Sequence, residues 1–194
     1  RRGELREAWL EFLGPLEIER AKPPAYEVLD QDKVEGVIRR LIRYEVEPGE
    51  PVEAWLLGPD REGGGRPGVV VFHSTVDHSL HQPAGVKGVP EKAFGLMLAK
   101  RGSVCLCPRN YLWPENERID ARGEEAGYPE QRLKTRVKMR MLADGLRAVD
   151  LLAALPEVDP ARLGCVGHSL GAKEALYQAA FDERIKAAVS SEGG

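Results

Sequence analysis

Residues 161–180 constrain the fold of this 194-residue chain more than any other passage. An apolar run is followed there by a Gly-x-Ser-x-Gly sequence centred on Ser169, and then by apolar residues at helical spacing. The order strand, glycine-flanked turn, helix places a serine on a sharp turn where larger neighbouring side chains would collide. A helix-capping serine alone would explain neither glycine, so Ser169 is the first candidate for a nucleophile.

Strand and helix patterns alternate along the chain around this turn. Continuous apolar runs predict strands buried on both faces, and apolar residues at a period near 3.6 predict helices. We therefore expect an α/β fold in which a mostly parallel sheet is covered by helices on both faces. The predicted strands are residues 69–72, 104–107, 161–166 and 185–189, and the predicted helices are residues 91–100, 132–155 and 170–180.

Two further predictions concern the N-terminal part. Residues 34–46 and 52–57 are strand-like and flank a Pro-Gly turn, which predicts an antiparallel hairpin that opens the sheet. Residues 4–13 have a helical pattern closed by Gly14 and Pro15, which predicts a helix lying on the body.

Composition favours one globular domain, with 42% hydrophobic and 30% charged residues. A net charge of −3 with both signs interspersed offers no basic stripe for nucleic acid, and no apolar run approaches the ~18 residues that a membrane span needs. Cys105, Cys107 and Cys165 lie in strand-like runs without metal-ligand spacing, so we expect buried free thiols and no metal site. Free thiols suit a reducing compartment, whereas a chain that begins at Arg1 leaves a removed leader possible.

These features together resemble the α/β-hydrolase superfamily, and within it dienelactone hydrolases and acetyl xylan esterases. The resemblance covers residues 34–194, namely the opening hairpin, the strand that ends in His73, the helix containing Asp144 and Asp150, and the turn at Ser169. Residues 1–33 are then an N-terminal helix and lead-in to a single hydrolase domain. Dienelactone hydrolases proper carry a cysteine nucleophile, so the serine here implies hydrolysis of carboxylic esters.

The resemblance implies a catalytic Ser169 and no cofactor. The backbone N–H of Leu170 would be one donor to the oxyanion, and the backbone of Ser74 or Thr75 would supply the second. The partner is then a small ester, such as an acylated sugar, with no nucleic acid or membrane involved. Candidate substrate contacts are His73, His78, Tyr111, Trp113 and His168.

The catalytic base and acid are harder to place. Similar proteins carry both after the serine, and no histidine of this chain follows Ser169. We expect His168 to point away from its neighbour. We also expect the chain to be a fragment that ends before the strands that bear the histidine and probably the acid. Glu192 is an alternative candidate for the acid. The simpler interpretation is that it is an ordinary polar residue in a turn.

A competing hypothesis makes His78 or His81 an unconventional base. Both lie in the loop that should border the site, and together with Asp77 they are a poor match for a metal site. Solvated loop residues are the simpler interpretation.

Two other functions stay open at this point: a peptidase domain of the prolyl-oligopeptidase kind, and a catalytically silent binding domain without the histidine. If the last strands are missing, the strand at residues 185–189 would leave an exposed sheet edge. Such an edge can pair with a second copy of the chain.

Overall fold

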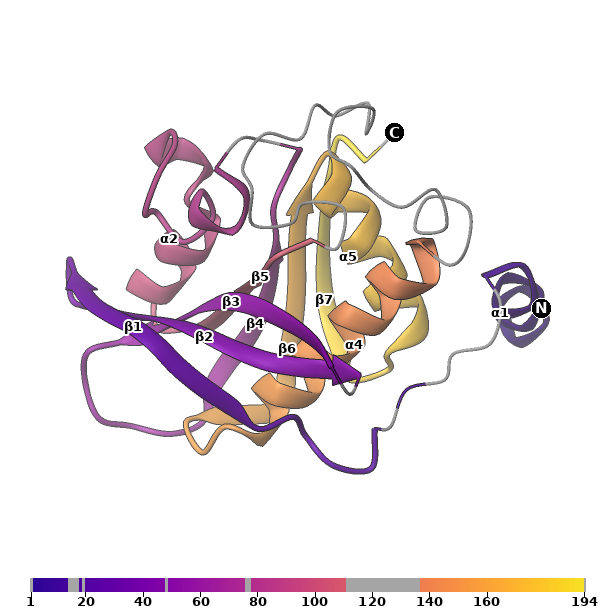
Figure 1. Cartoon of the computed structure of the whole chain (residues 1–194), viewed down its shortest axis with the longest axis horizontal. Coiled ribbons are helices and arrows are strands. Elements are labelled where there is room, and N and C mark those ends of the chain that lie inside the picture. Colours follow the sequence, from indigo (N-terminus) through magenta and orange to yellow (C-terminus); the bar gives the residue numbers. More distant parts are fainter. Residues whose placement is uncertain are drawn as a thin grey trace.

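The computed structural model describes residues 2–13, 18, 20–47, 49–75, 78–110 and 137–193, with the side chains of Arg2, Phe12, Leu13 and residues 137–139 left aside. Figure 1 shows its helices and strands, coloured along the sequence from indigo at the N-terminus to yellow at the C-terminus. In chain order they are α1 (Arg2–Leu13), β1 (Tyr26–Val34), β2 (Val37–Glu47), β3 (Glu50–Pro59), β4 (Arg66–Phe72), η1 (Ser79–His81), η2 (Pro90–Lys92), α2 (Phe94–Lys100), β5 (Val104–Pro108), α4 (Val137–Ala154), β6 (Val158–His168), α5 (Leu170–Phe181) and β7 (Ile185–Ser191).

The strands form one mixed sheet in the order β1-β2-β3-β5-β4-β6-β7. The first three strands pair antiparallel, and β3 pairs antiparallel with β5. From β5 onward the strands run parallel, so the carboxyl ends of β5, β4, β6 and β7 meet at one edge. This topology confirms the predicted α/β fold with its opening hairpin.

Alternate residues of the central strands enter two separate hydrophobic clusters. Leu56, Val70 and Leu106 pack on the face covered by α4 and α5, whereas Leu57 and Val71 pack on the face covered by α2. Figure 1 shows α2 on one side of the sheet and the two longer helices on the other. Burial on both faces explains why these strands have no polar alternation in the sequence.

The structure differs from the expected elements at three places, and a fourth expectation lies partly outside the described residues. Strand β1 was not predicted, because nearly all of its residues are exposed and it therefore lacks an apolar period. The expected helix over residues 91–100 is divided at Ala93 into η2 and α2. Strand β6 begins at Val158 rather than at residue 161, with a register shift against β4. Helix α4 begins at Val137, and residues 132–136 lie outside the described residues.

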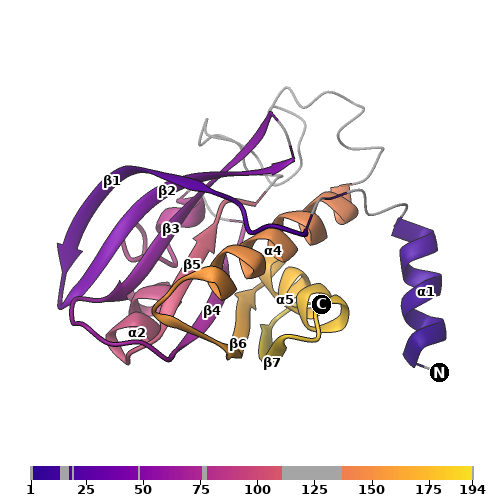
Figure 2. The same cartoon turned by 90° about the horizontal axis from the view of Figure 1, so that it is seen from below.

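The helix predicted over residues 4–13 is present as α1 and contacts the C-terminal half of α5, but its expected apolar face is not buried, since Leu5 and Trp9 are exposed. The rings of Trp9 and Tyr177 meet edge to face with centroids 6.2 Å apart, and Arg6 donates to the carbonyl oxygen of Phe181 at 3.3 Å. Figure 2 shows the helix at this periphery, beside the end of α5.

A network of two half-buried arginines and two buried aspartates fixes the lead-in to β1. The Arg20 guanidinium donates to Asp150 on α4 at 2.7 and 3.0 Å and to Asp182, just after α5, at 3.0 Å. Arg184 reaches the same two carboxylates at 2.6 Å each. Burial alone would raise the pKa of Asp150, but the hydrogen bonds from Arg20 and Arg184 outweigh it and hold that pKa below its usual value. The network therefore ties four parts of the chain together.

Three other expectations can be compared with the described residues. All three cysteines are buried free thiols, as predicted, and burial raises the pKa of Cys165 to about 12. No helix in the described part of the chain is long and apolar enough to cross a membrane. Strand β7 pairs only with β6 among the described strands, and most of its residues are exposed. Self-association through this edge stays a prediction.

Glu174 on α5 is an unusual carboxyl group, because it is only 4% exposed. Burial raises its pKa to about 8, the side chain of Asn110 counteracts this, and the nearby Asp144 carboxyl raises the pKa further. Among the described residues, its Oε2 atom has no hydrogen-bond partner. Ionisation of this group in the folded protein is therefore costly.

The substitution Glu174→Gln should remove this cost. As pH rises from about 4.5 to about 8, the unfolded chain loses the Glu174 proton while the folded protein keeps it, so stability falls over that window and then levels off. Relative to the unmodified protein, the variant should gain on the order of 3 kcal/mol between pH 5 and pH 9, measured by urea unfolding. Glu183→Gln is the control, since that side chain is 87% exposed. An equal pH dependence in protein and Glu174→Gln variant would contradict the assignment.

Candidate active site

Ser169 occupies the turn between β6 and α5 in a strained backbone conformation. Its φ of 55° and ψ of −114° lie where residues with a side chain are rarely found. Such a conformation costs on the order of 1–3 kcal/mol and persists only where the surroundings hold it. Here the Ser169 N–H donates to the Ser191 carbonyl at 2.9 Å, and the Ser169 carbonyl accepts from Ala172 at 3.1 Å.

The two glycines of the turn are required by close backbone contacts. A Cβ atom on Gly167 would lie 2.0 Å from the carbonyl oxygen of Gly171. A Cβ atom on Gly171 would lie 2.4 Å from the Phe72 oxygen and 2.8 Å from the His73 oxygen. The serine turn is therefore packed directly against the end of β4.

The segment that leaves β4 brings the expected second oxyanion loop to this turn. His73 is 2% exposed, and its Nε2 atom accepts from the backbone N–H of Asn110 at 3.0 Å. The Nδ1 atom must then carry the proton of the neutral ring, and it donates to the Ser74 carbonyl at 2.7 Å. Burial, with a contribution from the charge of Arg109, lowers the pKa of His73 to about 4. This burial leaves His73 little surface for the substrate contact that was expected of it.

A second hydrogen-bonded chain joins three loops at the same edge. The Ser74 hydroxyl lies 2.8 Å from Nδ1 of His168 and donates to the His168 carbonyl at 3.1 Å. The Nε2 atom of His168 lies 3.1 Å from Oε2 of Glu192. The two ring nitrogens of His168 are thus directed to Ser74 and to Glu192. This orientation agrees with the expectation that the ring points away from Ser169. Glu192 as a catalytic acid stays a prediction.

The remaining histidines are placed differently. His81 accepts at Nδ1 from the indole N–H of Trp55 at 2.9 Å, and His78 is exposed. Among the residues that the structure describes, no hydrogen bond joins a histidine ring to the Ser169 hydroxyl. The geometry therefore gives no support to His78 or His81 as the base. Three other residues named from the sequence lie outside the described residues: Asp77, Tyr111 and Trp113.

Sequence reasoning missed two residues that make structural contacts, of which only Asn110 lies at this edge. Asn110 follows β5 and acts through its backbone N–H, which no side-chain pattern reveals. Arg39 is buried on β2, lies over the ring of Trp55 at 5.8 Å, and donates to the carbonyls of Ala84 and Gly85 at 3.2 and 2.7 Å. Because Arg40 and Arg43 lie in the same strand, nothing in the sequence distinguished the buried arginine from its neighbours.

The electrostatics of the turn suit an anion. Ser169 immediately precedes α5, a helix of 12 residues, so the first N–H groups of that helix are directed at the site. The amino end of a helix carries a partial positive charge. The Leu170 N–H is thus well placed to stabilise a negative oxygen that forms beside Ser169.

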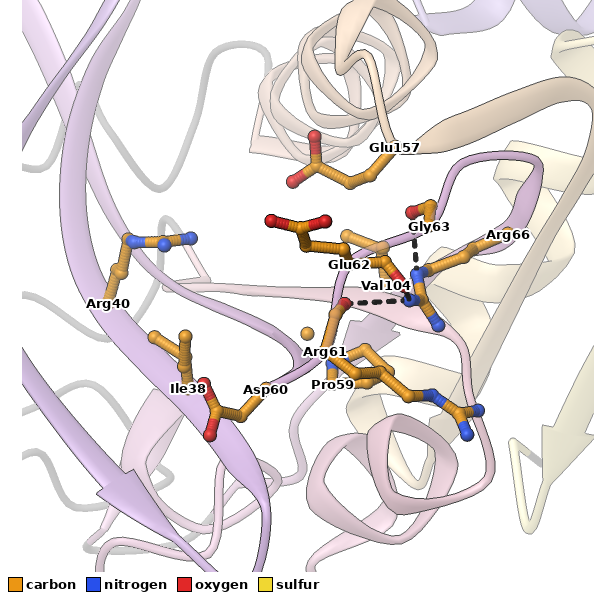
Figure 3. Close-up of a pocket in the computed structure, with 11 residues that line it drawn as sticks. Ile38, Arg40, Pro59, Asp60, Arg61, Glu62, Gly63, Arg66, Val104 and Glu157 are labelled. Atoms are coloured by element: carbon orange, nitrogen blue, oxygen red, sulfur yellow. Dashed lines mark hydrogen bonds between the residues drawn. The ribbon is translucent and has the colours of Figure 1, made fainter.

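A separate cavity of about 520 Å³ lies at the opposite end of the sheet, between the end of β3 and the starts of β4 and β5. Figure 3 shows Arg66 directed at the loop that forms one wall, where it donates to the Gly63 and Arg61 carbonyls. Ligands of open α/β sheets bind at the carboxyl ends of the strands. The cavity is therefore distinct from the candidate active site.

The mixed sheet, parallel from β5 through β4 and β6 to β7, and the serine turn between β6 and α5 define an α/β-hydrolase fold. The model of the dienelactone hydrolase family matches residues 52–193, and the chain belongs to that family.

The chain is also similar to individual proteins, and the likeness to the two solved structures among them is one of fold. YtaP of Bacillus subtilis (strain 168) is 28% identical over 196 residues, covering 97% of this chain and 63% of YtaP. The acetyl xylan esterase from Paenibacillus sp. R4 is 21% identical with a TM-score of 0.61, over 95% of this chain and 56% of that one. The glucuronoyl esterase from Solibacter usitatus is 18% identical with a TM-score of 0.58 and the same two coverages. The chain spans less than two thirds of the length of each relative.

The substitution Gly171→Ala should disrupt the contact between the turn and β4. The new Cβ atom would meet backbone oxygens, which cannot move without displacing the sheet, and we expect a loss of about 3 kcal/mol in unfolding free energy. Urea unfolding measures it. Gly58→Ala is the control, because its Cβ would lie 4.0 Å from Val104. Equal stability of the two variants would contradict the close approach.

Proposed function

We propose that this protein is a serine hydrolase that cleaves carboxylic esters through an acyl-enzyme. The observation that carries the proposal is the strained Ser169 at the amino end of α5, packed against the exit of β4. A backbone strain of this kind is retained where it serves a function. Membership of the dienelactone hydrolase family supports the proposal.

In the first half of the reaction, the Ser169 oxygen bonds to the ester carbonyl carbon as its proton passes to a base. The carbonyl oxygen becomes an oxyanion, which accepts hydrogen bonds from Leu170 and from the backbone of Ser74 or Thr75. Collapse of this intermediate breaks the bond to the alcohol oxygen. The alcohol leaves with one proton, and the acyl group stays on Ser169.

In the second half, water takes the place of the alcohol. Its oxygen bonds to the acyl carbon, one of its protons returns to Ser169, and the carboxylic acid is released. The same oxyanion donors serve both halves, because both intermediates carry the negative charge on the same oxygen.

The substrate class is proposed from polar surroundings and relatives. One structural relative is named an acetyl xylan esterase and another a glucuronoyl esterase. We extend this to acylated carbohydrates and other small polar esters for the present chain. His78 and His168 at the site edge, with Tyr111 and Trp113 after β5, stay the proposed contacts.

A silent binding domain is the second candidate function, because within the described ranges no histidine is hydrogen-bonded to Ser169. A peptidase of the prolyl-oligopeptidase kind has no comparable support. Turnover by the chain itself would exclude the silent domain, whereas a chain without turnover calls for the same assay on a longer chain.

The substitution Ser169→Ala should reduce hydrolysis of p-nitrophenyl acetate and p-nitrophenyl butyrate by about 10³-fold or more, because it removes the attacking oxygen. Release of p-nitrophenol measures it. Ser103→Ala is the matched control, since Ser103 lies before β5 at the opposite end of the sheet. Equal hydrolysis by protein and Ser169→Ala variant would exclude Ser169 as the nucleophile, and no hydrolysis by the unmodified chain would call for the same assay on a longer chain.

A further inference from the structure

Ser74 is held by hydrogen bonds on two sides, by His73 on one and by His168 on the other. We propose that His73 and His168 are positioning residues that fix the peptide between Ser74 and Thr75, so that the Thr75 N–H is the second oxyanion donor. The inference rests on the proposed function and deepens it, because sequence alone left Ser74 and Thr75 as alternatives.

We call the hydrogen bonds that join His73 and His168 to Ser74 the clamp. Its first side lies toward β5. His73 accepts from the N–H of Asn110, which follows β5, and donates to the Ser74 carbonyl at 2.7 Å. The Ser74 carbonyl is thereby directed to the β5 side of β4. In a trans peptide the N–H points opposite to the carbonyl, and the described chain has no cis peptide. The Thr75 N–H is therefore directed to the other side of β4, where β6 ends at the serine turn.

The neighbouring peptide has the reverse orientation. The His73 carbonyl oxygen faces Gly171, at 2.8 Å from the position of its Cβ. The N–H of Ser74 belongs to the same trans peptide and points away from α5. Ser74 is thus a poor donor to an oxyanion beside Ser169, and Thr75 is the better one.

The second side of the clamp lies toward β6. Glu192 accepts from Nε2 of His168 at 3.1 Å, which fixes the orientation of the ring. The Ser74 hydroxyl donates to the His168 carbonyl at 3.1 Å and lies 2.8 Å from Nδ1 of the same residue. With its carbonyl held by His73 and its hydroxyl by His168, Ser74 cannot rotate without breaking hydrogen bonds on a 7% exposed residue.

Both histidines act through Ser74 and touch no reacting atom, so their effect should fall on the transition state. Loss of one oxyanion donor costs about 10²–10³ in kcat in other hydrolases. Misorientation of the Thr75 N–H should therefore lower kcat with little change in KM, because the interaction forms only as the charge develops.

The test compares His73→Asn with His73→Leu in p-nitrophenyl acetate hydrolysis. The side-chain amide of Asn can donate from the position of Nδ1, whereas Leu cannot. We expect His73→Leu to lose about 10²-fold in kcat at unchanged KM, and His73→Asn to recover most of it. Ser74→Ala, which removes only the His168 side, should show a smaller loss. Equal kcat values for the Asn and Leu variants would overturn the inference.

A second readout does not depend on turnover. Phenylboronic acid adds to a serine oxygen as a tetrahedral anion, so its oxygen should meet the Thr75 N–H. We expect the Thr75 amide resonance to shift on titration in the unmodified protein and in His73→Asn, but not in His73→Leu. If these shifts of the Thr75 resonance are observed but no ester is hydrolysed, the proposed function is wrong and the inferred positioning of Thr75 is still supported. A Thr75 resonance that does not move in the unmodified protein overturns the clamp.

Discussion

The structure depends on the contact between Gly171 and the carbonyl groups that end β4. This approach leaves no room for a side chain, and it brings the first turn of α5 within reach of the segment after β4. The strained Ser169, the proposed oxyanion donors and the two histidines around Ser74 all take their places from it. A shift of an ångström at Gly171 would separate the proposed nucleophile from the groups proposed to stabilise the oxyanion.

Buried polar groups do a second task, which is to join segments that are distant in sequence. The arginine and aspartate network around Asp150 connects the lead-in to β1 with α4, with the residue after α5 and with the start of β7. Arg39 likewise connects β2 with Ala84 and Gly85. Each cation is matched by carboxylates or carbonyls, which offsets the cost of removing it from water. The sheet edge is thus assembled on a frame fixed at both ends.

The sequence predicted the parts of the fold that have a local physical signature. Central strands are buried on both faces and read as apolar runs, and the turn at Ser169 is marked by glycines that sterics require. Strand β1 has no such signature, since its exposed residues are held only by pairing with β2. At the site, Ser169 and the segment at His73 could be named in advance. The Asn110 N–H could not, because backbone groups carry no sequence signal, and the partners of His168 depend on where β7 ends.

The backbone at Ser169 has a further consequence. A φ of 55° raises the conformational free energy of a serine, whereas glycine adopts this φ without a steric penalty. Glycine at this position would therefore give a more stable fold, and selection for stability alone would favour it. Under the proposed function, the protein keeps a less stable residue at this turn because the Ser169 hydroxyl is needed for the reaction. Stability and chemistry are in direct conflict at one residue, and the surrounding contacts of β4, β7 and α5 supply the free energy that lets the conflict persist.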